Sequence, residues 1–195
     1  MPKINTEKLE QHRDWRRNQL IEAAGAIAIE SGGNSITVAA VAERAGLSRT
    51  SVYEYFASSA DLVADLIVEE LNDFVGILTE AITDPDNYEL AIQQWIDAAL
   101  RYIADGRHLL AKALSSTSTP KERAAEIGAS HRALLAPLTR SIAALGISDV
   151  SQALALIQSA TDVATKRIEG GSNPDSEIES VTTFCLAGLR SLTQF

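Results

Sequence analysis

Apolar residues recur along this chain mainly at spacings of three, four and seven, which is the pattern of amphipathic α-helices. Leu20, Ala24, Ile27 and Ala28 are an example near the amino terminus. No convincing alternation of apolar and polar residues indicates a β-strand. The pattern and its polar breaks predict an all-α fold of about nine helices. We expect them at about residues 7–31 (or 13–31), 38–45, 49–55, 58–82, 88–105, 107–114, 121–145, 149–169 and 174–192.

Residues 37–56, TVAAVAERAGLSRTSVYEYF, contain two short helical patterns joined by a tight turn at Gly46. Glycine accepts the positive φ that ends a helix, and Ser48 is suited to cap the helix that follows. Ala42 is small enough for two helices to cross closely, and Val52 faces the joint. These spacings indicate a helix-turn-helix, whose second helix enters the major groove of DNA. A tight αα-hairpin of any helical protein is the alternative.

The flanks of this motif add a family resemblance. RNQLIEAA at residues 17–24 precedes it, VYEYF at 52–56 ends it and SSADL at 58–62 follows it. Together they resemble the amino-terminal domain of the TetR (tetracycline-repressor-like) family of transcriptional regulators. The resemblance implies an N-terminal three-helix helix-turn-helix DNA-binding domain, residues 1–57, followed by a helical ligand-binding and dimerisation domain, residues 58–195. It also implies a ligand-responsive regulator, a repressor that binds a palindromic operator as a homodimer.

The residues expected to read DNA bases lie at the start of the second helix of the motif. Arg49 suits the O6 and N7 atoms of guanine, Thr50 suits a thymine methyl group, and Ser51 lies beside them. The predicted phosphate contacts are Thr37, Ser48, Tyr53 and Tyr55, and the resemblance supports Thr37 and Tyr53 in that role. For Tyr55, packing of the ring into the core is an equally good prediction.

Charge and one departure from the family pattern qualify this picture. The net charge is −9, but residues 1–60 hold seven basic and seven acidic residues, so all the excess acid lies in residues 61–195. The family usually has a phosphate-binding lysine at the position of Ser59. An N-terminal arm with Lys3, Lys8, Arg13, Arg16 and Arg17 is a candidate to contact the DNA backbone or the minor groove instead. The neutral N-terminal region leaves an alternative open: a helical dimeric interaction protein of the same fold with weak or lost DNA reading.

The remaining helices are expected to hold an unidentified small-molecule effector, as the resemblance implies, and no cofactor. The candidate ligand-binding residues are Trp95, Tyr102, His108, His131 and Thr161. For Trp95 and Tyr102, the alternative is that the two aromatic rings simply belong to a core. Few charges fall on the predicted inner faces, which favours an apolar or weakly polar ligand of moderate size.

The last two helices carry apolar stripes that suit a four-helix dimer interface. The stripes are Val150, Ala153, Leu154, Ile157, Thr161, Ala164 and Ile168, and Ile178, Val181, Cys185, Gly188, Leu189 and Leu192. Packing into the core of the same chain explains this periodicity equally well, and the two-fold symmetry of operators favours the homodimer. A close helix contact is a plausible reason for Gly188 inside a helix.

Several classes of function lack support in the sequence. Cys185, the only cysteine, stands among apolar residues and is expected to be a buried structural thiol. No His or Cys pair has metal-ligand spacing, and neither a glycine-rich phosphate loop nor a recognisable pair of catalytic carboxylates is present. We therefore expect no metal and no enzymatic activity. No apolar run approaches the ~20 residues of a membrane span. A cytoplasmic location without membrane contact is the expectation.

Overall fold

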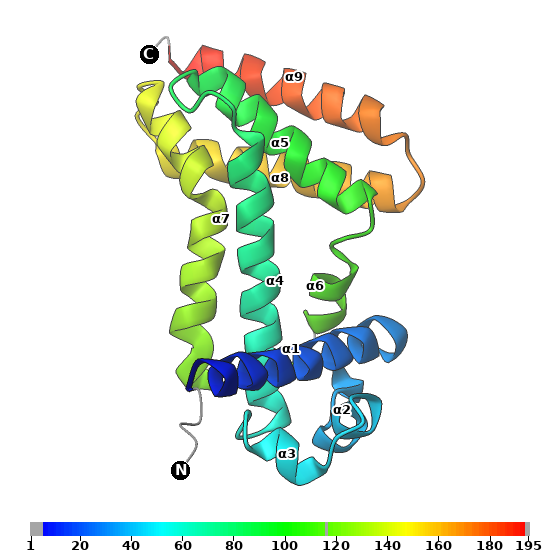
Figure 1. The fold of residues 1–195 in the computed structure, drawn as a ribbon. Coiled ribbons are helices and arrows are strands. Elements are labelled where there is room, and N and C mark those ends of the chain that lie inside the picture. Colours follow the sequence, from blue (N-terminus) through cyan, green and yellow to red (C-terminus); the bar gives the residue numbers. More distant parts are fainter. Residues whose placement is uncertain (1–5, 116, 194–195) are drawn as a thin grey trace. The chain divides into compact units, whose positions relative to one another are not determined.

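The structure is a computed structural model that describes residues 6–115 and 117–193, with side chains from Gln11 onward. Within these residues the chain is all-α, as predicted, with nine α-helices and two short 3-10 helices (Figure 1). The elements are α1 (Thr6–Ser31), η1 (Gly33–Ser35), α2 (Val38–Arg44), α3 (Arg49–Tyr53), α4 (Ser59–Ala81), α5 (Tyr88–Ala104), α6 (Leu109–Leu114), η2 (Lys121–Arg123), α7 (Ala124–Ala144), α8 (Val150–Glu169) and α9 (Pro174–Leu192). None of the described helices combines the length and the apolar character needed to cross a bilayer.

Side-chain caps start several helices where the sequence predicted them. Asn173 Oδ1 accepts the N–H of Ser176 at 3.0 Å, and proline occupies the first position of α9. Asp149 caps α8 in the same way. In contrast, α3 is shorter than predicted, because it ends at Tyr53 and the chain continues as a turn to Tyr55.

The chain divides into two compact units, which are described separately below. The head unit comprises Met1–Glu70 with Leu109–Gly128, and the body unit comprises Leu71–His108 with Ala129–Phe195. Because Glu70 and Gly128 fall inside α4 and α7, each of these helices contributes residues to both units. The predicted functional boundary between residues 57 and 58 is a different division, and it stays a prediction.

The head unit has one core formed by α1, α2, α3, the start of α4 and α6. Its most deeply buried side chains include Leu20, Val41, Val52, Phe56 and Leu62. Leu114 of α6 is 2% exposed in the same cluster, and α6 packs against α1 and η1. Gly33 is needed at this junction, since a Cβ atom there would lie 2.7 Å from the carbonyl oxygen of Ala113.

The body unit is built on α5, α8 and α9, which pack against one another in pairs, and it includes parts of α4 and α7. The buried members of the two predicted stripes belong to its own core: Ala153, Ile157, Ala164 and Ile168 of α8, and Ile178, Cys185 and Leu189 of α9. The stripes therefore pack within this chain, the alternative that periodicity had left open. Among the described residues of this chain, no atom lies within 4 Å of the position that a Cβ of Gly188 would take, so the close helix contact predicted there is not made within the chain and stays a prediction for a second copy.

Candidate DNA-binding surface and effector cavity

The turn between α2 and α3 has the backbone geometry that its glycine makes possible. Gly46 has φ of 67°, and its N–H donates to the carbonyl of Glu43 at 3.2 Å. The N–H of Leu47 donates to the carbonyl of Ala42 at 2.9 Å, which completes a Schellman motif at the end of α2. Ala42 is buried where the two helices meet. The predicted helix-turn-helix is confirmed.

Hydroxyl side chains cap both helices of the motif. Thr37 Oγ1 accepts the N–H of Ala40, and Ser48 Oγ accepts the N–H of Ser51, each at 3.1 Å. A capping hydroxyl uses its oxygen as the acceptor and keeps its proton to donate elsewhere. The hydroxyls of Ser48 and Ser51 are also 3.0 Å apart, a contact that uses only one of their two protons. Both caps are exposed, so protons at the start of each helix remain available to an anion.

The outer surface of α3 presents the residues predicted to read DNA. Arg49 and Thr50 are exposed, Ser51 is half-buried, and the Tyr53 ring is 58% exposed. Tyr55 is half-buried and packs on the head core, beside the fully buried Phe56. The packing predicted for Tyr55 is thus present, and its role at a phosphate stays a prediction.

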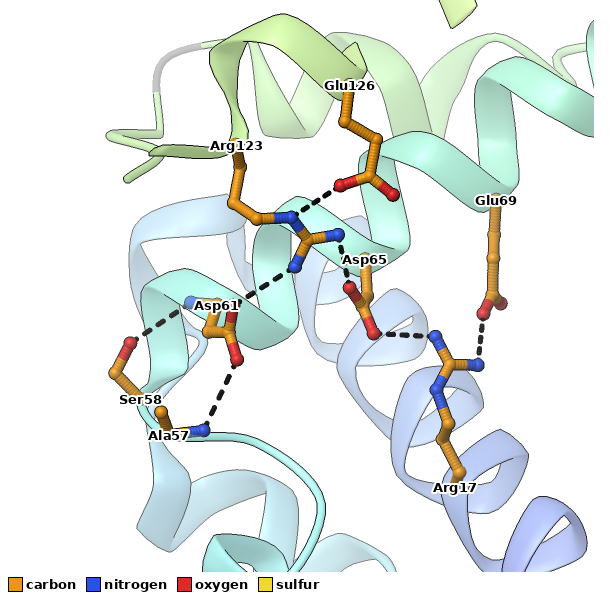
Figure 2. A network of polar contacts seen from close by, with 8 residues as sticks. All are labelled: Arg17, Ala57, Ser58, Asp61, Asp65, Glu69, Arg123 and Glu126. Carbon is orange, nitrogen blue, oxygen red and sulfur yellow. Dashed lines mark hydrogen bonds and ion pairs between the residues drawn. The ribbon is translucent and has the colours of Figure 1, made fainter. Parts of the chain in front are cut away.

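A network of ion pairs joins three parts of the head unit (Figure 2). We call it the Asp65 network, and its charged members are Arg17, Asp61, Asp65, Glu69, Arg123 and Glu126. Arg17 donates to Asp65 and to Glu69, each at 2.6 Å. Arg123 donates to the second oxygen of Asp65 at 2.6 Å, to Asp61 at 3.0 Å and to Glu126 at 2.6 Å. The network connects α1, the first turns of α4 and the start of α7.

Asp61 links this network to the segment between α3 and α4. Its carboxylate accepts the N–H of Ala57 at 3.3 Å, and its own N–H donates to Ser58 Oγ at 3.1 Å. Arg123 therefore binds a carboxylate that holds the chain a few residues after α3. The hydrogen bond to Glu126, followed by those to Asp65 and Asp61, raises the pKa of Arg123 above its ordinary value, against the opposing effect of burial.

The network corrects one expectation and adds a residue that the sequence did not suggest. Arg17 is neutralised by two carboxylates and lies 5.8 Å above the centre of the Phe56 ring, so it is no free arm residue. Lys3 and the side chain of Lys8 lie outside the described residues. Sequence reasoning missed Arg123. The available signal was Asp61, Asp65 and Glu69, which are four positions apart and therefore lie on one side of α4, where like charges repel unless cations from elsewhere pair with them.

A cavity of about 220 Å³ in the body unit gathers three of the five predicted ligand-binding residues. Trp95, His131 and Thr161 line it, and its other lining residues are Phe74, Ala99, Leu100, Ile103, Leu134, Leu135, Gln158, Asp162 and Thr165. The indole N–H of Trp95 donates to the Leu134 carbonyl at 3.0 Å, which fixes the ring in the wall. The cavity combines an apolar wall with several polar side chains.

The other two predicted ligand-binding residues lie outside this lining. Tyr102 is buried and stacks on Phe74, with ring centroids 4.2 Å apart. It supports a residue of the cavity wall. His108 is half-buried, and its Nε2 lies 2.8 Å from Glu169 Oε1. This bond joins the segment between α5 and α6 to α8 and gives His108 a structural role.

A larger open groove, about 700 Å³, runs between α5 and α9 of the body unit. Arg101, which pairs with Asp97 and Asp175, lines it, as does Arg190, which pairs with Glu89 outside the lining. These guanidinium groups are already partly satisfied by carboxylates. None of the predicted ligand-binding residues lines this groove.

The outward side of α8 and α9 carries apolar side chains that the predicted stripes did not include. Leu156, Val163 and Phe184 are each more than half exposed, and Phe184 reaches 70%. Leu156, Phe184 and Gly188 help line a shallow apolar groove of about 190 Å³ between the two helices. Exposed apolar groups that adjoin one another are typical of a surface that another molecule covers.

Comparison with known proteins connects the head unit to one family. Residues 20–66 match the family described as bacterial regulatory proteins, tetR family. Over 87 residues the chain is 28% identical to an uncharacterized HTH-type transcriptional regulator of Mycobacterium tuberculosis, covering 45% of this chain and 44% of that protein. Over 76 residues it is 30% identical to the HTH-type transcriptional activator FasR of Mycolicibacterium smegmatis, covering 38% and 35%. The chain thus spans less than half the length of these relatives.

Solved structures resemble the chain over most of its length. The fatty acid degradation regulator FadR from Bacillus halodurans has a TM-score of 0.72 at 19% identity, covering 90% of this chain and 96% of that one. The transcriptional regulator FadR from Bacillus subtilis, solved in complex with stearoyl-CoA, has a TM-score of 0.67 at 21% identity, covering 88% and 96%. At these identities the likeness shows the fold. The relatives and structures named here are regulators, not enzymes. Residues 20–66, the segment with the helix-turn-helix, thus match the tetR family of bacterial regulatory proteins, and the rest of the chain shares the fold of the solved regulators.

Proposed function

We propose that this protein is a ligand-responsive transcriptional repressor that binds a palindromic operator as a homodimer in the cytoplasm. The observation that carries the proposal is the surface of α3. Arg49 and Thr50 stand exposed at its start, and the capped turn before it fixes the helix on the head core. This is the arrangement in which a recognition helix presents its first residues to base edges.

Phosphate contacts follow from the two caps. The protons left on the hydroxyls of Thr37 and Ser48, together with free N–H groups at two helix starts, suit the backbone oxygens of a duplex. The exposed hydroxyl of Tyr53, on the last residue of α3, is a further donor in this proposal.

A homodimer through the last two helices accounts for their exposed apolar side chains. In this proposal Leu156, Val163 and Phe184 are covered by the same residues of a second copy. An isologous interface of this kind places two recognition helices about a two-fold axis, which matches half-sites roughly 34–36 Å apart on DNA.

The effector site that we propose is the cavity lined by Trp95, His131 and Thr161. The α5–α9 groove is larger, but its ion-paired rim makes it the weaker candidate for an apolar or weakly polar ligand. A volume of about 220 Å³ lies below the ~300–1,000 Å³ of typical drug-sized sites. We infer a compact amphipathic effector, smaller than the stearoyl-CoA bound by FadR of Bacillus subtilis.

The test is a selection of sheared genomic DNA on the purified protein, in parallel with an Arg49→Ala/Tyr53→Ala variant and an Arg132→Ala control. Arg132 is exposed on α7 in the body unit. Enrichment of a two-fold-symmetric site by the wild type and the control, but not by the double variant, is the expected result. If nothing is enriched, or all three proteins recover the same fragments, α3 does not read sequence. The interaction protein of the same fold then becomes the better account.

A further inference from the structure

Several of the basic side chains of the head unit are already paired with carboxylates of the same unit. Arg17, Arg44 and Arg123 are each bonded to carboxylates of the same unit. Among the side chains described there, the cations without such a bond are Arg13, Arg16, Arg49 and Lys121. A polyanion that binds this unit must find its counter-charges among these few residues, because paired guanidiniums are already neutralised.

Two of these cations lie together at one concave site. Arg13, Arg16 and His12 of α1 surround it with Glu54 and Tyr55, which follow α3, and its volume is about 510 Å³. We call it the α1–Tyr55 cleft. Arg13 and His12 are exposed, whereas Arg16 and Tyr55 are half-buried. A spacing of three residues places both arginines on one side of α1.

The side chains of the cleft suit a phosphate diester. Each guanidinium offers parallel N–H donors to phosphate oxygens, and a tyrosine hydroxyl can donate another hydrogen bond. Among the side chains that the structure describes from Gln11 onward, Glu54 is the only carboxylate in the lining, so two fixed positive charges face one negative charge there. Tyr55 also places the cleft immediately after the segment that carries the base-reading residues.

We propose that the α1–Tyr55 cleft binds a phosphate of the DNA backbone, which makes α1 part of the DNA-binding surface. Arg13 and Arg16 are the cations of this contact, and the adjacent Arg17 is excluded because Asp65 and Glu69 hold it. The inference rests on the proposed DNA-binding function and adds a site to it, outside the helix-turn-helix itself.

The test compares the salt dependence of operator binding in the full-length protein. The variant is Arg13→Gln/Arg16→Gln, and the control is Arg132→Gln/Lys166→Gln, which removes the same charge from exposed positions of the body unit. We expect the slope of log K against log salt to fall by about 0.9 for each phosphate that a subunit of the variant no longer neutralises, while the preferred sequence is retained. The control should keep the wild-type slope. A variant slope equal to that of the control would overturn the proposal.

Two further variants separate this inference from its premise. Glu54→Gln removes the opposing charge and should strengthen binding to any duplex, whereas unchanged affinity would count against the cleft. Trp15 is 55% exposed on the same turn of α1, so DNA should alter its fluorescence, and Trp15→Phe should abolish that change. If the wild-type protein binds no DNA, the proposed function fails. If it binds while all these responses are absent, only the cleft is wrong.

Discussion

Arg123 lies 2.6 Å from one carboxylate oxygen of Asp65, while Arg17 lies 2.6 Å from the other. One acidic side chain at the start of α4 therefore joins α1 to the chain segment that leads into α7. Through Asp61, the same network reaches the backbone that follows α3. An arginine far from α3 in the sequence thus binds the carboxylate that holds the chain after α3.

Removing Asp65 should destabilise the head unit. Its side chain is 18% exposed and that of Arg123 is 21% exposed, so Asp65→Ala leaves two partly buried guanidiniums without their shared partner. We expect a loss of about 1–3 kcal/mol in the free energy of unfolding, between the values for exposed and fully buried ion pairs. Urea denaturation measures it. Arg190→Ala, which breaks a more exposed pair with Glu89, should cost clearly less. Equal losses in the two variants would show that the network adds no special stability.

The caps of the helix-turn-helix allow stability and DNA binding to be separated. Aspartate is a good N-cap residue, so Thr37→Asp and Ser48→Asp should preserve or slightly raise stability. The same changes replace a hydroxyl donor by a negative charge where we propose a phosphate, and operator affinity should fall at least tenfold. Asn173→Asp makes a comparable cap change at α9 and should leave affinity unaltered. Thermal unfolding and operator titration together test this, and retained affinity in both variants would remove the caps from the contact surface.

Cys185 should resist thiol reagents in the native protein. Burial raises the pKa of its thiol to about 11, and only the thiolate reacts. With an ordinary pKa near 9.0, the native thiolate fraction at pH 8 is lower by roughly 100-fold, so labelling should be slower by about that factor than in urea. The same raised pKa makes the free energy of unfolding depend on pH. The stability that the protonated thiol allows is fully present below pH 9 and is lost as pH rises towards about 11, because in that range the thiol ionises in the unfolded chain but not in the folded one. Cys185→Ala should lack that part of the pH dependence, and rapid native labelling would contradict the burial.

The sequence was sufficient for features that depend on neighbouring residues. The positive φ of Gly46, the cap at Ser48 and the start of α9 at Pro174 follow from local chemistry, and the structure confirms them. The shorter α3 shows the limit of local reasoning, because its last predicted turn is replaced by the turn that leads to Phe56.

Features that depend on partners distant in sequence could not be predicted in this way. Periodicity identified an apolar face on each of the last two helices, but it did not show that this chain covers those faces itself. Leu114 and Arg123 belong to the head unit because of packing and charge pairing that no local pattern displays. Likewise, Trp95 and Thr161 were candidates from separate helices, and only the fold places them around one cavity.

The exposed apolar side of α8 and α9 should mediate self-association. Leu156→Glu/Phe184→Glu places two charges where we propose contact with a second copy, and it should yield a monomer in sedimentation equilibrium. Both side chains are more than half exposed, so stability of the monomer should change little. Thr183→Glu, at an exposed position that lines the α5–α9 groove, should remain dimeric. A wild-type monomer, or a double variant that still dimerises, would rule out this surface as the interface.

Filling the cavity should abolish the response to an effector. Ala99 is almost fully buried in the cavity wall, and Ala99→Leu adds volume where we propose that the ligand binds, at a cost in stability of about 1–3 kcal/mol. Ala104→Leu makes the same change at an exposed position of α5. A thermal-shift screen of small amphipathic metabolites should find compounds that stabilise the wild type and Ala104→Leu but not Ala99→Leu, since a ligand at 100 times its Kd adds about 2.7 kcal/mol. The same compounds should release operator DNA from the first two proteins only. Compounds that stabilise all three proteins equally would bind elsewhere, and the α5–α9 groove would become the leading site.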